Sequence, residues 1–397
     1  MKPSLSGISV ASRLRRVQLG VTLVELMVAM TLSLAIVAAV GYVYLQGKQG
    51  FAVQDGQSRL QEDARLAFST LSRDILMAGY FGCVKAYDPK PTAEYTNLRI
   101  TAAQPIATAD IGWLEKDGDQ TSGGRFLDVN KVVRGYDAGA NWPVPSTLAA
   151  KRFDNTDTLV LLRGGEDARH LSEAVNPATG DVVKVASAIT GVGAGDTRLM
   201  VISNCTSGEI FKGAVVGGGL TFNVDPADNK NISATVADPV NDGSLRGADS
   251  TGYSELAMIT TFEPVTYYVA LGKGANGNQV PTLYRMGLQT TDSLGTNGLW
   301  STNGGNAVIQ GVESFTIRYL IDGAAPGTSL GPFTAADVTA KSAWATLVAL
   351  VVNVTLVSDA DNLNTVSSTR TINGVSVTDT RARYQTSFTV NLRNRRI

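Results

Sequence analysis

The stretch that decides the fold is Leu26–Gly47, LMVAMTLSLAIVAAVGYVYLQG, which contains 22 residues without a formal charge. As an α-helix it would rise about 33 Å, enough to cross a hydrocarbon core of about 30 Å. The first 20 residues contain no acid and four basic residues: Lys2, Arg13, Arg15 and Arg16. The positive-inside rule therefore predicts that residues 1–20 lie in the cytoplasm and that the chain after Lys48 lies outside the inner membrane.

A cleaved secretory signal and a buried soluble helix are the alternatives for this stretch. Ala39-Val40-Gly41 has the small-x-small pattern of a signal cleavage site, but the apolar run continues through Leu45. Glu25 also interrupts the apolar sequence near its start. A carboxylate costs about 2.5–3.5 kcal/mol at the bilayer centre, and a signal sequence gains nothing from it. These observations favour a retained membrane segment.

The residues around Glu25 resemble a known processing signal. Gly20–Met27, GVTLVELM, is similar to the class III signal of type IV prepilins, in which a basic leader ends in glycine and the fifth mature residue is glutamate. The resemblance implies cleavage by prepilin peptidase between Gly20 and Val21 and N-methylation of Val21. Two features depart from the family's pattern: the mature first residue is Val where Phe is usual, and the leader is long at 20 residues.

The same resemblance assigns Glu25 a role in subunit docking. An acid near the start of a helix meets the positive end of the helix macrodipole. In a packed filament the terminal amine of a neighbouring subunit could pair with it, which removes most of the cost of a buried charge. We therefore expect Glu25 to direct this subunit onto others while it is still in the bilayer.

The helix is predicted to continue beyond the membrane. An apolar face of about 100° recurs at steps of three or four residues through Leu60, Ala64, Ala67, Phe68, Leu71, Ile75 and Ala78. Charged residues lie off this arc, namely Arg59, Glu62, Asp63, Arg65, Arg73 and Asp74. Gly79 is the predicted stop. Several glycines between Gly41 and Gly56 predict a bend or a melted turn. The pilin resemblance implies a helix of about 55 residues, about 80 Å long.

The chain after Cys83 is predicted to be β-rich, in keeping with the 41 glycines of the full sequence. The predicted strands are Asp157–Arg163, Thr197–Ser203, Glu209–Val216, Phe262–Leu271, Thr282–Met286, Val312–Ile321, Ala345–Ser358 and Tyr384–Leu392. Asn373-Gly374 between two short apolar runs predicts a hairpin. The polar stretch 221–255 is interpreted as a long loop or insertion.

The two cysteines, Cys83 and Cys205, lie 122 positions apart. An even pair in an oxidising compartment indicates a disulfide bond. Closing a loop of that size contributes about 4–5 kcal/mol in the chain-entropy model. The bridge would tie the end of the helix to the middle of the β-rich region; two separate buried thiols are the alternative.

Composition and motifs argue against catalysis, metal binding and nucleic-acid binding. Lys+Arg total 34 and Asp+Glu total 35, so bulk positive charge is absent. One histidine, His170, and two cysteines leave no Cys/His zinc site, and a lone histidine is usually structural. The acidic turns Asp117-Gly118-Asp119 and Asp359-Ala360-Asp361-Asn362 lack the closing glutamate of an EF-hand. The basic end at Arg393, Arg395 and Arg396 is too small for a nucleic-acid site. No catalytic residue, metal ligand or cofactor is therefore predicted.

Short segments toward the C-terminus resemble the PilW group of minor pilins. They are Pro281–Arg285, Val312–Tyr319 and Phe388–Arg395, together with Ala78–Cys83 at the end of the helix. The prepilin signal is shared by all type IV pilins and pseudopilins, whereas these segments are more diagnostic of PilW. Residues 90–260 add little to the resemblance.

The predicted fold class is α+β, with a long N-terminal pilin helix packed on a β-rich periplasmic domain. The helix has a transmembrane half and an amphipathic half. The predicted boundaries are a basic leader at 1–20, the helix at 21–80 with its transmembrane segment at 21–45, a β-rich region at 81–260 and a C-terminal β-rich region at 261–397.

The resemblance implies a non-enzymatic minor pilin that helps to prime filament assembly in a tip complex. Its expected partners are other minor pilins and pilus subunits, prepilin peptidase, the inner membrane and a tip adhesin. Three alternatives remain open. They are a type II secretion pseudopilin, a membrane-anchored periplasmic binding protein or enzyme in which Glu25 is incidental, and a DNA-uptake or adhesin pilin.

Overall fold

Residues of both the helix and the β-rich region are described by the structure, a computed structural model. The described residues are 20, 22–82, 84, 98–100, 132–140, 142, 152–153, 155–176, 182–205, 208–224, 245, 252–274, 277, 279–287, 305–323, 329–359, 361, 367–372 and 375–394. The chain divides into two compact units, Met1–Asp55 and Gly56–Ile397, and the boundary falls inside the N-terminal helix.

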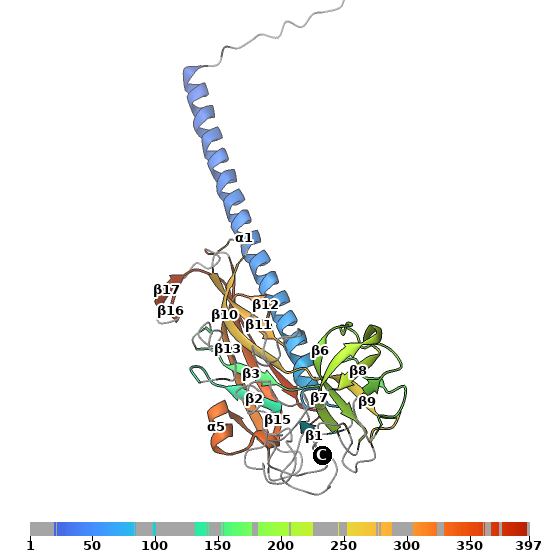
Figure 1. The fold of residues 1–397 in the computed structure, drawn as a ribbon. Coiled ribbons are helices and arrows are strands. Elements are labelled where there is room, and N and C mark those ends of the chain that lie inside the picture. The colour runs from blue at the N-terminus through green and yellow to red at the C-terminus, as the bar shows by residue number, and fades with distance from the viewer. Residues whose placement is uncertain are drawn as a thin grey trace, which may run out of the picture. The chain divides into compact units, whose positions relative to one another are not determined.

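The N-terminal helix, α1, runs from Leu23 to Met77 over 55 residues (Figure 1). Its length confirms the prediction. A melted turn is absent between Gly41 and Gly56, where every residue is helical, and the alternative of a bend stays a prediction. One helical glycine costs about 1 kcal/mol relative to alanine, whereas opening a turn gives up several backbone hydrogen bonds. The predicted stop at Gly79 is confirmed, since this residue has a φ of 78°, in the left-handed region that favours glycine.

A five-stranded antiparallel sheet of order β12-β11-β10-β3-β2 packs against the second half of α1. Its strands are β2 (Val133–Tyr136), β3 (Thr158–Leu161), β10 (Val265–Lys273), β11 (Gln279–Met286) and β12 (Asn306–Gln310). Neighbouring side chains on β10 point to opposite faces. Tyr267 faces α1, while the ring of Tyr268 lies 5.0 Å from Trp142 and 5.6 Å from Tyr284.

A second, four-stranded antiparallel sheet has the order β14-β13-β15-β18. Its strands are β13 (Val312–Asp322), β14 (Ser329–Phe333), β15 (Leu347–Val357) and β18 (Arg383–Asn391). Helix α5 (Ala335–Ala340) and the 3₁₀ turn η3 (Trp344–Thr346) connect β14 to β15. Tyr319 links the two sheets, because a Cβ atom at Gly135 of β2 would overlap its hydroxyl group. Only glycine fits at that crossing.

The third sheet closes on itself. Its order is β4-β9-β6-β7-β8-β5, with β1 pairing in parallel to β7. The two ends of this order meet at Leu171 and Val185, which form a bridge, and Ser172 N–H donates to Lys184 O at 2.9 Å. The result is a small barrel with a core that includes Met200, Phe211 and Phe222. Its elements are β1 (Leu98–Ile100), β4 (Arg169–His170), β5 (Val182–Lys184), β6 (Thr197–Ser203), β7 (Gly208–Val216), the 3₁₀ turn η2 (Gly217–Gly219), β8 (Thr221–Val224) and β9 (Met258–Thr261).

The barrel is inserted between two neighbouring strands of the five-stranded sheet. β3 and β10 pair with each other through Leu161 and Val265. Beyond that pair, Glu263 N–H donates to Arg163 O at 2.8 Å and Gly165 N–H donates to Thr261 O at 2.7 Å. The chain thus leaves and re-enters the sheet through a two-stranded neck, here defined as residues 162–165 and 261–264.

The predicted Asn-Gly hairpin is confirmed. β16 (Ser368–Ile372) and β17 (Val375–Asp379) pair so that Ile372 faces Val375.

An ion cluster lies at the base of this hairpin. Arg383 Nε and Nη2 donate to Glu313 at 2.9 and 3.1 Å, and its Nη1 and Nη2 donate to Asp379 at 2.8 and 3.0 Å.

All eight predicted strands are present, with ends that move by a few residues. β6, Thr197–Ser203, has its predicted bounds, whereas β10 begins at Val265, after Pro264. The interpretation of 221–255 as a loop is wrong at its start, where β8 pairs with β7. Phe222 and Val224 alternate into the barrel core, which is the period-2 signal of a strand.

Candidate assembly site on the N-terminal helix

Of the predicted processing and docking residues, Glu25 lies in the first turn of α1. Gly20 is exposed and precedes the helix, and Val21 lies outside the described residues. Thr22 caps the helix: Glu25 N–H donates to Thr22 Oγ1 at 3.2 Å, and Leu26 N–H donates to Thr22 O at 3.1 Å. This cap holds Glu25 in the first turn, where the macrodipole favours a carboxylate.

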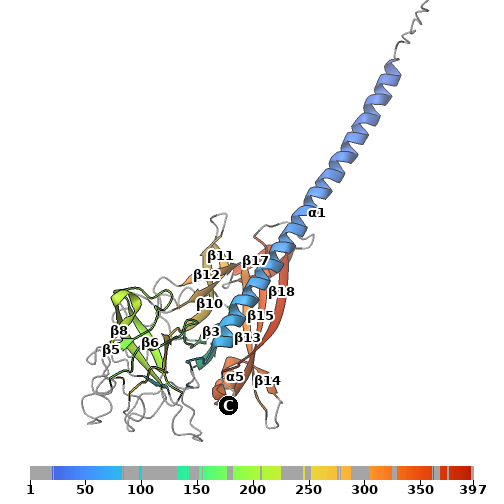
Figure 2. The same cartoon turned by 90° about the vertical axis from the view of Figure 1, so that its right-hand side faces the viewer.

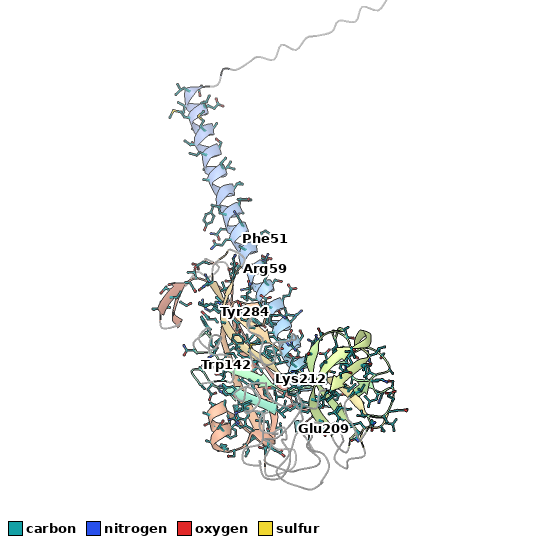
Figure 3. The ribbon with its side chains drawn as sticks, in the orientation of Figure 1. Phe51, Arg59, Trp142, Glu209, Lys212 and Tyr284 are labelled. Atoms are coloured by element: carbon teal, nitrogen blue, oxygen red, sulfur yellow. The ribbon has the colours of Figure 1, made fainter. Side chains whose placement is uncertain are left out.

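The first half of α1 is an exposed apolar rod. Every residue from Leu23 to Ala52 is exposed, and Phe51 keeps 74% of its surface (Figure 3). Among the described residues, α1 alone is long and apolar enough to cross a membrane. So much exposed apolar surface is stable only in contact with lipid or with another protein. The segment therefore fits a membrane anchor.

The second half of α1 uses its predicted apolar face for packing within the second unit. Six of the seven predicted residues are buried: Leu60, Ala64, Ala67, Leu71, Ile75 and Ala78. The seventh, Phe68, stays 47% exposed, but its ring meets the ring of Phe388 on β18 edge-on at 5.0 Å. Burial of this face confirms the amphipathic assignment.

A buried carboxylate, Asp74, attaches this half of α1 to the five-stranded sheet. Its side chain has no exposed surface. Oδ2 accepts a hydrogen bond from the Tyr267 hydroxyl and another from Arg285 Nε, each at 2.6 Å. Oδ1 lies 3.4 Å from Nη2 of Arg163, which is 3% exposed. Two guanidinium groups and a hydroxyl group thus surround one helix carboxylate.

Electrostatics favour the ionised form of this carboxylate. Burial by itself would raise the pKa of Asp74, but the hydrogen bond and charge of Arg285, with the charge of Arg163 and the Tyr267 hydroxyl, hold the pKa below its usual value. Burial and the adjacent carboxylate raise the pKa of Tyr267. Asp74 is therefore charged and Tyr267 neutral at neutral pH.

The ion pairs extend from α1 to the neck of the barrel. Arg163 Nη2 also lies 3.0 Å from Glu263 Oε2, across the two neck strands. Glu166, just past the neck, lies 3.4 Å from Arg73 Nε and 3.5 Å from Arg163 Nη1. One network thus joins the helix, the sheet and the neck, and we call it the Asp74 network.

Backbone hydrogen bonds join the end of α1 to the same neck. Gly79 N–H donates to Leu162 O at 2.9 Å, and Gly164 N–H donates to Tyr80 O at 2.6 Å. From the other side, Asn394 Nδ2 donates to Leu76 O at 2.9 Å. The last turn of the helix is therefore held from two directions.

The predicted bridge between Cys83 and Cys205 stays a prediction, because Cys83 lies outside the described residues. The surrounding residues are compatible with it. A Cβ atom at Gly82 would overlap the side chain of Ser203, so the chain beside Cys83 passes against the end of β6. Ser203 lies two residues before Cys205 along the chain.

The remaining candidates for chemistry are dispersed. His170 is exposed on β4, and its Nδ1 lies 3.2 Å from Leu256 O. Asp361 accepts hydrogen bonds from Thr380 N–H at 2.9 Å and from its hydroxyl at 2.8 Å. The turn 117–119 and residues 395–396 lie outside the described residues. Within the described part of the chain, no group of three or more His, Cys, Asp or Glu side chains could hold a metal ion.

Sequence reasoning missed the Asp74 network. Asp74 is one of the charged residues off the predicted apolar arc, yet at about 100° per residue it lies only about 20° beyond the arc's edge at Ala67. That position was the available signal. Nothing in the sequence indicated Arg163, Tyr267 and Arg285 as its partners, because they are 89, 193 and 211 positions away.

Together these features define an α+β protein with a long N-terminal apolar helix and a β-rich region attached to its second half. Residues 266–394 match a family model, PilW, described as type IV pilus-assembly protein W. This match confirms the PilW resemblance for the strands β10–β18 and supports involvement in type IV pilus assembly. The family is described as an assembly component and not as an enzyme. No curated protein and no solved structure is significantly similar to the chain.

Proposed function

We propose that this protein is a minor pilin that takes part in a priming or tip complex of the type IV pilus, with other minor pilins as its direct partners. It is processed between Gly20 and Val21, methylated on Val21, held in the inner membrane by the first half of α1 and incorporated into the filament. The β-rich region lies in the periplasm, and the protein has no enzymatic activity.

The observation that carries this proposal is the first turn of α1. A threonine cap holds Glu25 at the head of an apolar helix whose every residue to Ala52 is exposed. A simple anchor gains nothing from a carboxylate there, since it costs about 2.5–3.5 kcal/mol at the bilayer centre and less near the edge. A filament subunit gains a partner for the terminal amine of its neighbour.

Three other functions can be compared with this proposal. A type II secretion pseudopilin would use Glu25 in the same way, and the match of residues 266–394 to a pilus-assembly family favours the pilus. A membrane-anchored periplasmic binding protein or enzyme would not need Glu25. A DNA-uptake or adhesin pilin would need a basic patch, and no observation favours it over the assembly role.

The test is Glu25→Ala, with Glu62→Ala as the matched control on the exposed side of the same helix. We expect Glu25→Ala to keep membrane insertion but to reduce both surface piliation and the amount of this subunit in sheared filaments by about tenfold or more, the effect of losing about 1.4 kcal/mol of docking. Glu62→Ala should assemble normally. Mass spectrometry of the wild-type N-terminus should give methylated Val21.

Normal piliation and incorporation of Glu25→Ala at normal protein abundance would contradict the docking role. A mature protein that begins at Tyr42, or that retains Met1, would contradict the processing. Equal loss in Glu25→Ala and Glu62→Ala would indicate a general defect of the helix, and the anchored binding protein would then be the better interpretation.

A further inference from the structure

The outer edge of β18, the last strand of the four-stranded sheet, pairs with no strand in the described part of the chain. The strand pairs with β15 along its whole length without a register shift. The first pair is Arg383 with Val357, and the last pair is Asn391 with Ala349. In the order β14-β13-β15-β18 this strand is the outermost, and Figure 2 shows it at the margin of its sheet beside α1. Nine residues of backbone therefore present one side to a possible partner.

The backbone groups on that edge can be identified from the ladder. Leu392 N–H donates to Val348 O at 2.9 Å, so Leu392 points its N–H toward β15. The direction alternates along an antiparallel strand. The N–H groups of Gln385, Ser387, Thr389 and Asn391 therefore point away from β15. The side chains of the same four residues are all exposed.

This edge lacks the features that usually prevent strands from pairing with other chains. Such features are charged side chains, proline, bulges and short length. The outer strand β14 contains Pro332, the outer strand β12 pairs across an irregular register, and β2 has four residues. In β18, residues 384–391 contain no charge and no proline. The adjacent Arg383 is paired with Glu313 and Asp379.

We propose that the free edge of β18 is a docking site for an extended, uncharged β-strand of a different pilus subunit. The added strand would continue the four-stranded sheet by main-chain hydrogen bonds, with β-branched or aromatic side chains opposite Thr389 and Ser387. A charged strand is disfavoured, since no residue in 384–391 could balance its charge. This proposal rests on the proposed function, which supplies the neighbouring subunits.

A second copy of this chain fits the edge poorly. Phe388 of β18 lies by Phe68 of α1, and Asn394 lies by Leu76, so β18 runs in the same direction as the helix. Antiparallel pairing of two β18 strands would place the two Gly56 residues, where the chain enters the second unit, at opposite ends of the pair. Two copies anchored in one membrane through their N-terminal helices would not reach that arrangement. The partner strand therefore comes from another subunit.

The test uses the full-length protein in piliated cells. Ser387→Pro removes an outward N–H and leaves the ladder to β15 intact. Thr389→Lys adds a protective charge to the same edge. The matched control is Ala214→Lys, which adds the same charge at an exposed position on β7, a strand paired on both sides. All variants should be present at wild-type abundance and with wild-type protease resistance.

We expect Ser387→Pro and Thr389→Lys to reduce the subunit in sheared pili by about tenfold, and Ala214→Lys to leave it unchanged. A photoreactive amino acid at Thr389 should cross-link to another pilus subunit, and one at Ala214 should not. Normal incorporation of both edge variants would overturn the proposal, and a cross-linked homodimer would overturn the choice of partner. If cells without this protein make normal pili, the proposed function fails, and with it the pilus-subunit partner of β18.

Discussion

At the scale of single residues, the main feature is a charge buried on a helix. Asp74 has no exposed surface and is surrounded by Arg163, Arg285 and Tyr267. A buried ion pair adds little stability compared with an apolar contact, but removal of one partner leaves a buried charge without compensation. The Asp74 network therefore specifies how the second half of α1 is attached, and it is sensitive to any single change.

The first prediction concerns Asp74→Asn. The amide keeps the size of the side chain but removes the counter-charge of Arg285 and the buried one of the three carboxylates around Arg163, so we expect a loss of about 3–5 kcal/mol in the free energy of unfolding. Asp63→Asn on the same helix is the control. Burial and then Glu62 raise the pKa of Asp63, so removing its charge should cost nothing. Urea denaturation of detergent-solubilised protein, followed by tryptophan fluorescence, measures both.

The same network predicts a dependence on pH. The pKa of Asp74 is lower in the folded protein than its ordinary value of about 3.9. A depressed carboxylate pKa contributes stability that is fully present above the unfolded value and is lost as the pH falls below about 4. The stability difference between wild type and Asp74→Asn should therefore shrink below that pH. A difference that stays constant from pH 7 to pH 3 would contradict this assignment.

The cysteines give a prediction about covalent structure. We expect non-reducing peptide mapping of membrane-extracted protein to recover one peptide pair joined through Cys83 and Cys205. Breaking the bridge by Cys205→Ser should cost about 2–5 kcal/mol in the free energy of unfolding, the usual cost of removing a native disulfide. Recovery of both residues as free thiols from protein exposed to the periplasm would refute the bridge.

At the scale of elements, α1 serves two environments with two kinds of surface. Its first half is apolar on all sides and fully exposed, whereas its second half buries one face within the second unit. Periodicity distinguishes these halves, because a helix surrounded by lipid needs no polar face and a helix packed on a protein surface does. The change from one pattern to the other falls near Gly56, where the chain enters its second unit.

Two leucines on the second half of α1 provide a matched test. Leu71 is completely buried and Leu66, five residues earlier, is 47% exposed. We expect Leu71→Ala to lower the free energy of unfolding by about 2–5 kcal/mol because it leaves a cavity. Leu66→Ala should cost well under 1 kcal/mol in the isolated protein. Similar losses in the two variants would mean that the helix face is assigned wrongly.

At the scale of the whole molecule, the inserted barrel is the main addition to the fold. The match to the PilW model begins at residue 266, next to Val265, where β10 begins after the neck. The barrel has its own core and closes through Leu171 and Val185, and all of its strands except β1 lie between β3 and β10 along the chain. It is therefore an insertion between two strands that already pair with each other.

This arrangement predicts that the barrel can be removed. Replacing residues 166–260 by Asn-Gly would join Gly165 to Thr261, whose backbones already share a hydrogen bond of 2.7 Å. We expect the remaining sheets and α1 to fold, with protease resistance retained and Trp344 still buried. Glu166 is lost from the Asp74 network, but Arg163 and Glu263 remain. The deletion also removes Cys205 and the partner strand of β1, so the shortened protein should carry Cys83→Ser and is expected to fold with β1 unpaired. Aggregation or complete proteolysis of the shortened protein would show that the barrel is part of the common core.

Features that depend on local pattern are predictable from the amino-acid sequence. Each of these features depends on residues that are close together in the sequence. They are the apolar run, the glutamate at its start, the amphipathic face, the β-branched strands such as Thr197–Ser203 and the Asn-Gly hairpin. Short strands such as β4 and β5 are not predicted from the sequence, because two or three residues show too little periodicity to be recognised as a strand.

Only the tertiary structure decided which distant residues meet. The partners of Asp74 come from β10, β11 and the neck, and the closure of the barrel depends on Leu171 meeting Val185. No local preference favours these contacts. They form because burying the apolar faces of the strands and helix brings the polar groups together, and each buried polar group then needs a partner.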